Sequence, residues 1–135
     1  MLKKGGLAVA VWLLQAGAAQ AGTLPSLFTA QQASAGADVF SQNCAMCHGA
    51  DLKGAAGPAL IGQSFASPGN GATLGGIFSV IAQQMPASSP GSLTQTQYEN
   101  AMAYILKLNG YPAGTKPLVY KDALASTLPL TSQVK

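Results

Sequence analysis

One short motif, Cys44-Ala45-Met46-Cys47-His48, constrains this chain more than any other stretch. It contains both cysteines and the single histidine of the 135 residues. Two thiols separated by two residues can form a disulfide or a thioredoxin-like dithiol, although no βαβ pattern surrounds them. A zinc site would need a fourth ligand that the motif does not supply. The sequence Cys-x-x-Cys-His favours a further interpretation, covalent attachment of a c-type haem through two thioethers with His48 on the iron.

Residues 1–21 have the pattern of a secretory signal peptide. Lys3 and Lys4 precede an apolar stretch, and Ala19-Gln20-Ala21 provides small residues two apart, as at a cleavage site. The apolar core is shorter than the ~20 residues that a membrane-spanning helix needs. We therefore expect cleavage after Ala21 and a periplasmic protein. Contact with a membrane is expected only if this segment is retained.

Charged residues are sparse, at 8% of the chain. Without Lys3 and Lys4 the balance is five lysines against four acidic residues, a net charge of +1. Nucleic-acid binding needs a clustered basic face, so nucleic acid is not an expected partner. The length is that of one small domain.

Capping residues and apolar spacing predict helices and no β-sheet. Thr29 and Gln32 have the form of a capping box, and a later helix is preceded by another, either Thr94 with Gln97 or Thr96 with Glu99. Apolar residues then recur at intervals of three and four. We expect helices at residues 30–43, 73–83 and 95–108, with one helical turn at about residues 121–126.

Gly36 and Phe40 share one face of the first expected helix. A glycine there admits the backbone or ring of a neighbouring helix, and Tyr104 of the 95–108 helix is the candidate neighbour. We therefore expect these two helices to cross. The alternatives are an ordinary core phenylalanine and a surface tyrosine.

Residues 49–62 contain four glycines and one proline, which predicts a loop that covers a haem on its His48 side. A ligand histidine usually donates its second ring N–H to a carbonyl or carboxylate. The carbonyl of Pro58 is the candidate acceptor. A simple turn proline is the alternative.

Met85 follows the expected 73–83 helix and precedes Pro86, so it lies in an irregular segment. Most methionines fill gaps in a core. If a haem is bound, however, its iron needs a sixth ligand or an open position, and a His/Met pair is typical of electron-transfer cytochromes c. Met85 is the candidate because Met102 lies within a helix and Met46 lies between the two cysteines. An open or readily freed iron would instead suit a peroxidase-like enzyme or a gas binder.

The Cys44–His48 motif, Gly57-Pro58-Ala59-Leu60, Met85-Pro86 and the helix carrying Tyr104, in this order, resemble the class I cytochrome c family over residues 34–111. The resemblance implies a small all-α fold of three to four helices around one haem c that is attached outside the cytoplasm. It also implies that Cys44, Cys47, His48, Pro58, Leu60 and Met85 bind the cofactor. Residues 85–94 and 104–114 are similar to cytochrome subunits of periplasmic quinoprotein-type dehydrogenases.

These features predict an electron carrier and not an enzyme. Its expected donor is a periplasmic dehydrogenase, and its expected acceptor is an oxidase or another cytochrome of the respiratory chain. Sparse charge predicts docking through an apolar patch. A haem subunit fixed in one complex is the alternative. The expected divisions are a cleaved signal at residues 1–21, a cytochrome domain at 22–112, and an arm or tail at 113–135.

Overall fold

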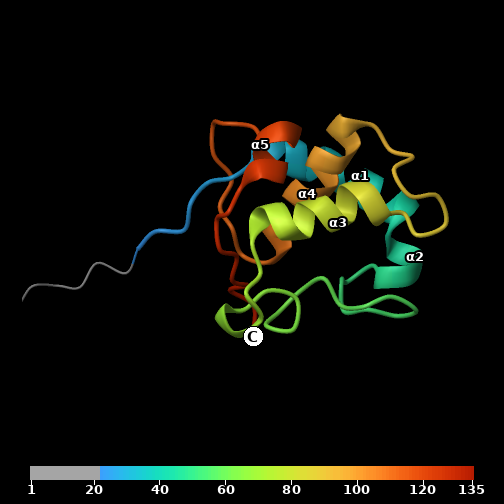
Figure 1. Cartoon of the computed structure of the whole chain (residues 1–135), viewed down its shortest axis with the longest axis horizontal. Coiled ribbons are helices and arrows are strands. Elements are labelled where there is room, and N and C mark those ends of the chain that lie inside the picture. Colours follow the sequence, from blue (N-terminus) through green and yellow to red (C-terminus); the bar gives the residue numbers. More distant parts are fainter. Residues whose placement is uncertain (1–21) are drawn as a thin grey trace, which may run out of the picture.

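The computed structural model describes residues 22–135, and these residues form helices joined by loops (Figure 1). This part of the chain contains no β-strand, only isolated bridges between Thr29 and Gly114 and between Thr73 and Pro129. The predicted all-α fold is therefore confirmed. The predicted signal peptide lies outside the described residues. In chain order the helices are α1 (Ala30–Asn43), α2 (Ala45–His48), the 3₁₀ helix η1 (Pro68–Asn70), α3 (Leu74–Gln84), α4 (Gln95–Leu108) and α5 (Tyr120–Ala125).

Three threonines set where the long helices begin. Thr29 caps α1 in a reciprocal box with Gln32, and Thr94 caps α4 in the same way with Gln97. The hydroxyl of Thr73 accepts the backbone N–H of Gly76 at 3.0 Å and starts α3. Because a cap satisfies amides that have no partner inside the helix, it defines a sharp start. The expected bounds of α1 and α4 match the structure, and α3 begins and ends one residue later than expected.

The crossing of α1 and α4 is the most extensive helix–helix contact among the described residues. At Gly36 the helices approach so closely that a Cβ atom would lie 1.8 Å from the backbone oxygen of Asn100. Beside this point the rings of Phe40 and Tyr104 pack with their centroids 5.4 Å apart. The predicted crossing is confirmed, and it fixes the end of α1 from which the Cys44–His48 motif continues.

The sequence patterns predicted neither α2 nor η1, so the described residues contain one more α-helix than expected. Helix α2 is a single turn in which the N–H of His48 donates to the carbonyl of Cys44 at 2.9 Å. Four residues are too few to show a helical period. The turn nevertheless matters, because it sets the relative positions of the two thiols and the imidazole.

Residues 113–135, here named the strap, lie across the helical body and not away from it. Leu118, Ala123 and Leu130 of the strap are buried. Near its end the strap pairs with the start of α3, where the N–H groups of Leu74 and Gly75 donate to strap carbonyls at 2.9 and 3.0 Å. In Figure 1, α5 lies at the upper left of the helical body and α2 lies on its right side. Of the two expected forms, arm or tail, the structure shows an arm.

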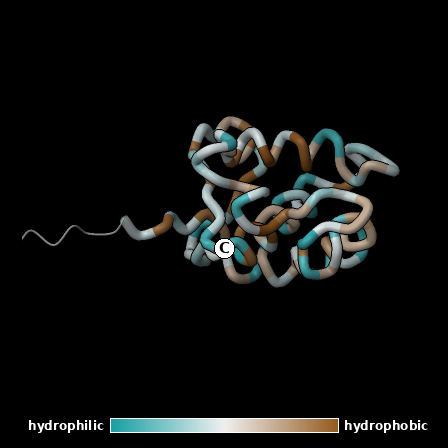
Figure 2. Tube along the Cα trace, turned by 90° about the horizontal axis from the view of Figure 1, so that it is seen from below, coloured by the Kyte–Doolittle hydropathy of each residue, from teal (hydrophilic) through white to brown (hydrophobic). Residues whose placement is uncertain are grey.

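Hydrophobic residues alternate with hydrophilic ones along the described trace (Figure 2). The main core contains buried residues from α1, α3, α4 and the strap, and a second cluster joins Phe40, Leu52 and Ile105. Within residues 22–135, no helix has both the length and the apolar character that crossing a bilayer requires. The second cluster lies under the loop that follows the cysteine motif and connects this loop to α1 and α4.

Candidate functional site

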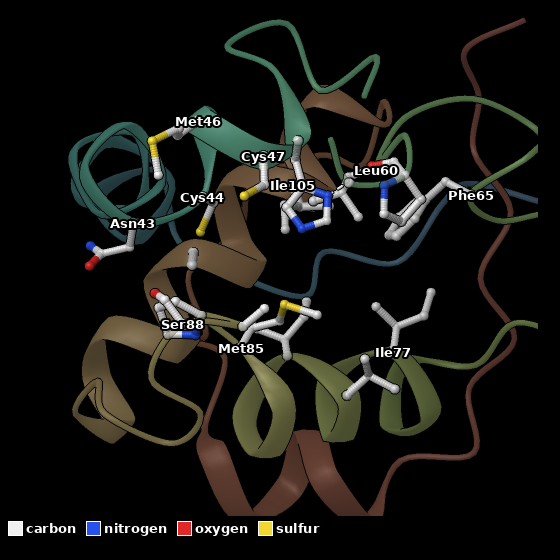
Figure 3. A pocket seen from close by; sticks show the side chains of 18 of the residues that line it. Asn43, Cys44, Met46, Cys47, Leu60, Phe65, Ile77, Met85, Ser88 and Ile105 are labelled. Carbon is white, nitrogen blue, oxygen red and sulfur yellow. Dashed lines mark hydrogen bonds between the residues drawn. The ribbon is translucent and has the colours of Figure 1, made fainter. Parts of the chain in front are cut away.

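A cavity of about 780 Å³ lies beside the cysteine motif. Its size is within the range of small-molecule and cofactor sites. Cys44 and Cys47 point into it from the α2 side, and Met85 and Ile77 point into it from the opposite side (Figure 3). The structure thus gathers all six site residues expected from the sequence around one cavity: Cys44, Cys47, His48, Pro58, Leu60 and Met85.

The two cysteines are free thiols and do not form a disulfide. Burial raises the pKa of the Cys44 thiol, and the neighbouring Cys47 raises it further. A redox-active dithiol depends on a lowered thiol pKa, so this environment disfavours that chemistry. Among residues 22–135, no three His, Cys, Asp or Glu side chains lie close enough together to form a metal-binding cluster.

His48 is oriented by the loop that follows it. Its Nδ1 atom lies 2.8 Å from the carbonyl oxygen of Pro58, which is the expected contact. Because a carbonyl can only accept, Nδ1 carries the hydrogen, and in the neutral ring this leaves the lone pair of Nε2 free. Gly57 lies against the ring, since a Cβ atom there would be 3.1 Å from Cε1 of His48. The imidazole is therefore held in the tautomer that a metal-binding Nε2 requires.

The same loop is attached to the backbone of the motif. The N–H of Gly57 donates to the carbonyl of Cys47 at 2.7 Å, and that of Gly54 donates to His48 at 2.8 Å. Leu52 is fully buried and has a φ of +62°, an unusual conformation for a residue with a side chain. Its carbonyl accepts the N–H of Leu60 at 2.7 Å. The loop is thus closed on itself, and Leu60 is directed to the cavity wall.

Asn109 fixes the end of this loop, a role that the sequence did not reveal. Its side-chain amide donates to the carbonyls of Leu60 and Ile105, each at 2.9 Å, and accepts the N–H of Gly62 at 3.2 Å. The residue is 1% exposed. From sequence, Asn109 indicates only the end of a helix. Two of its partners, Gly62 and Leu60, are 47 and 49 residues away in the chain, and no local sequence pattern connects them to Asn109.

Met85 is the C-cap of α3 and has an extended backbone. Its N–H still donates to Ile81 of α3 at 3.3 Å, and its carbonyl accepts the hydroxyl of Tyr98 at 2.7 Å. Met102 is fully buried in the main core and does not line the cavity. Met46 lies at the rim and is 90% exposed. Met85 is therefore the methionine that faces the cavity from a fixed backbone.

The cavity lining is apolar or neutral. None of its residues is Lys, Arg, Asp or Glu. Two thiols, an imidazole with a free Nε2, a thioether and an apolar interior together fit the requirements of a c-type haem. Sequence reasoning did not identify Phe65 as part of this site. The remaining large apolar side chains of the lining are Phe65, Ile77, Val80, Ile81 and Ile105.

Comparison with known proteins gives two matches. The family model described as cytochrome c oxidase, cbb3-type, subunit III matches residues 31–105. A chain in the crystal structure of the sulfane dehydrogenase SoxCD from Paracoccus pantotrophus is similar with a TM-score of 0.54 and 24% identity. The alignment covers 93% of this chain and 69% of that one, and at this identity it shows the fold alone. No curated protein shows significant similarity to the chain.

Proposed function

Because the chain belongs to the cytochrome c family whose model it matches over residues 31–105, we propose that it is a periplasmic electron carrier with one haem c, and not an enzyme. Members of this class transfer electrons and hold haem c covalently. The observation that supports an electron carrier with one haem c is that Cys44, Cys47, His48 and Met85 all line one uncharged cavity.

When bound, haem supplies a one-electron couple between Fe(III) and Fe(II). Cys44 and Cys47 would hold it through two thioethers. His48 would offer Nε2 to the iron, because Nδ1 is committed to the carbonyl of Pro58. That hydrogen bond also fixes the orientation of the ring.

Met85 would offer its sulfur from the opposite wall. A thioether ligand and apolar surroundings both favour the reduced state. Leu60, Phe65 and Ile77 line the interior and would exclude water from it. With His48 and Met85 both holding the iron, no position would be left for a substrate, as suits a carrier.

For the partners, we propose a periplasmic dehydrogenase as donor and an oxidase or another cytochrome of the respiratory chain as acceptor. The similarity of residues 85–94 and 104–114 to cytochrome subunits of quinoprotein-type dehydrogenases supports this donor class. The structurally similar chain also comes from a dehydrogenase. The periplasmic location rests on the signal pattern in residues 1–21. Co-purification of the native protein with either enzyme distinguishes a fixed subunit from a free carrier.

The surface beside the cysteine motif suits contact with a protein partner. Met46 is 90% exposed there, although its position between the cysteines did not suggest a surface role. Ala87, in the segment after Met85, is also exposed. Because charged residues make up only 8% of the chain, the proposed docking relies on short-range apolar contact.

The test is a comparison of oxidised spectra of the holoprotein and two methionine variants. The wild type should be low-spin with a far-red sulfur-to-iron charge-transfer band. Met85→Ala should lose this band and bind external ligands. Met102→Leu, a volume-conserving change in the core, should keep it. A high-spin wild-type spectrum would contradict the proposal and favour a peroxidase-like enzyme or gas binder. A band that survives in Met85→Ala would assign the ligand to another methionine.

A further inference from the structure

Tyr98 connects helix α4 to the segment that carries Met85. The residue is 3% exposed, and its hydroxyl donates to the backbone carbonyl of Met85 at 2.7 Å. The same hydroxyl accepts the backbone N–H of Leu93 at 3.3 Å. One side-chain oxygen therefore holds both ends of the segment from Met85 to Leu93.

The Met85 backbone is fixed on both sides by these contacts. Its N–H donates to Ile81, so it continues the hydrogen bonding of α3. Its carbonyl accepts two hydrogen bonds, one from the Tyr98 hydroxyl and a longer one of 3.3 Å from the N–H of Gly91. Of these two, the Tyr98 contact is the one that anchors the segment to another helix.

Side-chain direction depends on the backbone, because the backbone fixes the Cα–Cβ bond and limits χ1 to a few staggered values. Met85 sits directly after the last residue of α3, where a helix end would otherwise fray. A hydrogen bond that stops this fraying also keeps the thioether pointing into the cavity, as it does in Figure 3. The other tyrosine of α4, Tyr104, packs instead on Phe40 of α1.

We propose that Tyr98 is a positioning residue that keeps the sulfur of Met85 directed at the site opposite His48. The proposal rests on the proposed function, in which Met85 is a ligand. Removal of the hydroxyl leaves the Met85 carbonyl with the Gly91 N–H alone. The segment from Met85 to Leu93 then moves away from α4 more often, and an external ligand displaces the Met85 sulfur more easily.

The experiment uses the ferric holoprotein with Tyr98→Phe, and Tyr104→Phe as the matched control on the same helix. Two quantities are measured, the intensity of the far-red band and the dissociation constant for imidazole. We expect Tyr98→Phe to weaken the band and to lower the imidazole dissociation constant about fivefold, the factor that corresponds to one net hydrogen bond. Tyr104→Phe should leave both quantities at wild-type values.

A thermal melt distinguishes a role of Tyr98 in positioning Met85 from a role in the stability of the whole fold. In Tyr98→Phe the band should disappear at a lower temperature than the far-UV circular dichroism signal, with a wider gap than in the wild type. An unchanged band and an unchanged imidazole affinity in Tyr98→Phe, with the band lost in Met85→Ala, would overturn the role of Tyr98 alone. Equal changes in both tyrosine variants would also overturn it. A wild type without the band would refute Met85 ligation itself, and with it this proposal.

Discussion

Gly36 lies where α1 and α4 are closest, and a methyl group there has no room. In Gly36→Ala the new Cβ would lie 1.8 Å from the carbonyl oxygen of Asn100 and 2.9 Å from Cβ of Tyr104. Neither atom is the end of a flexible side chain that could move aside. Ordinary contact begins at about 3.4 Å, so the helices would have to separate locally by about 1.6 Å.

The size of the effect follows from two opposing contributions. Replacing glycine by alanine inside a helix contributes about 1 kcal/mol of stability. Overpacking costs about 1–3 kcal/mol, and the rigid carbonyl places Gly36 at the upper end of that range. If α1 and α4 separate by 0.5–1 Å, the atoms that face each other across the contact lose about a quarter to a half of their dispersion energy. These atoms include those of Phe40 and Tyr104. We expect a net loss of about 2 kcal/mol and a fall in Tm of about 10 °C.

Thermal unfolding of the ferric holoprotein, followed by far-UV circular dichroism, measures this loss. Gly69→Ala is the control, since a Cβ atom at Gly69 would meet only Ser67 Oγ at 3.9 Å. Its Tm should stay near the wild-type value, as for most surface changes. If Gly36→Ala were as stable as the wild type or more so, the close crossing would be wrong.

Two further predictions concern the loop and the docking surface. Asn109→Ala removes three hydrogen bonds in a buried position and should lower the free energy of unfolding by about 2–3 kcal/mol in guanidinium titrations. Ser132→Ala should cost less, because Gly62 keeps Asn109 as an acceptor, and an equal loss would argue against the Asn109 network. In stopped-flow measurements with a redox partner, raising the salt from about 20 to 200 mM should slow electron transfer less than about threefold, whereas a tenfold fall would indicate electrostatic steering.

The long helices of this fold could be predicted from local sequence. Thr29 with Gln32 and Thr94 with Gln97 mark helix starts through contacts that span only three residues. The glycine at position 36 also predicted the crossing, because a glycine on the face that carries Phe40 gives room for a close neighbour. Local patterns succeed here since capping and periodicity are themselves local.

The supports of the site were harder to predict because they join residues far apart in the chain. Tyr98 lies within the expected 95–108 helix, and nothing local indicates where its hydroxyl points. Asn109 was predicted as a helix stop, although its side chain holds Leu60 and Gly62. By contrast, the positions of Cys44, Cys47 and His48 follow from a motif with fixed spacing. Their binding of haem remains a prediction that the spectra test.

The strap has a consequence for the order in which the molecule is completed. Chains emerge from the ribosome with their N-terminal side first. Every residue that lines the cavity lies between positions 42 and 105, and all of them emerge before the strap does. The acceptors for the first amides of α3 arrive only with Ser126 and Leu128. Until Ser126 and Leu128 are in place, the start of α3 lacks these acceptors, so the helix that leads to Met85 is completed only by the last part of the chain.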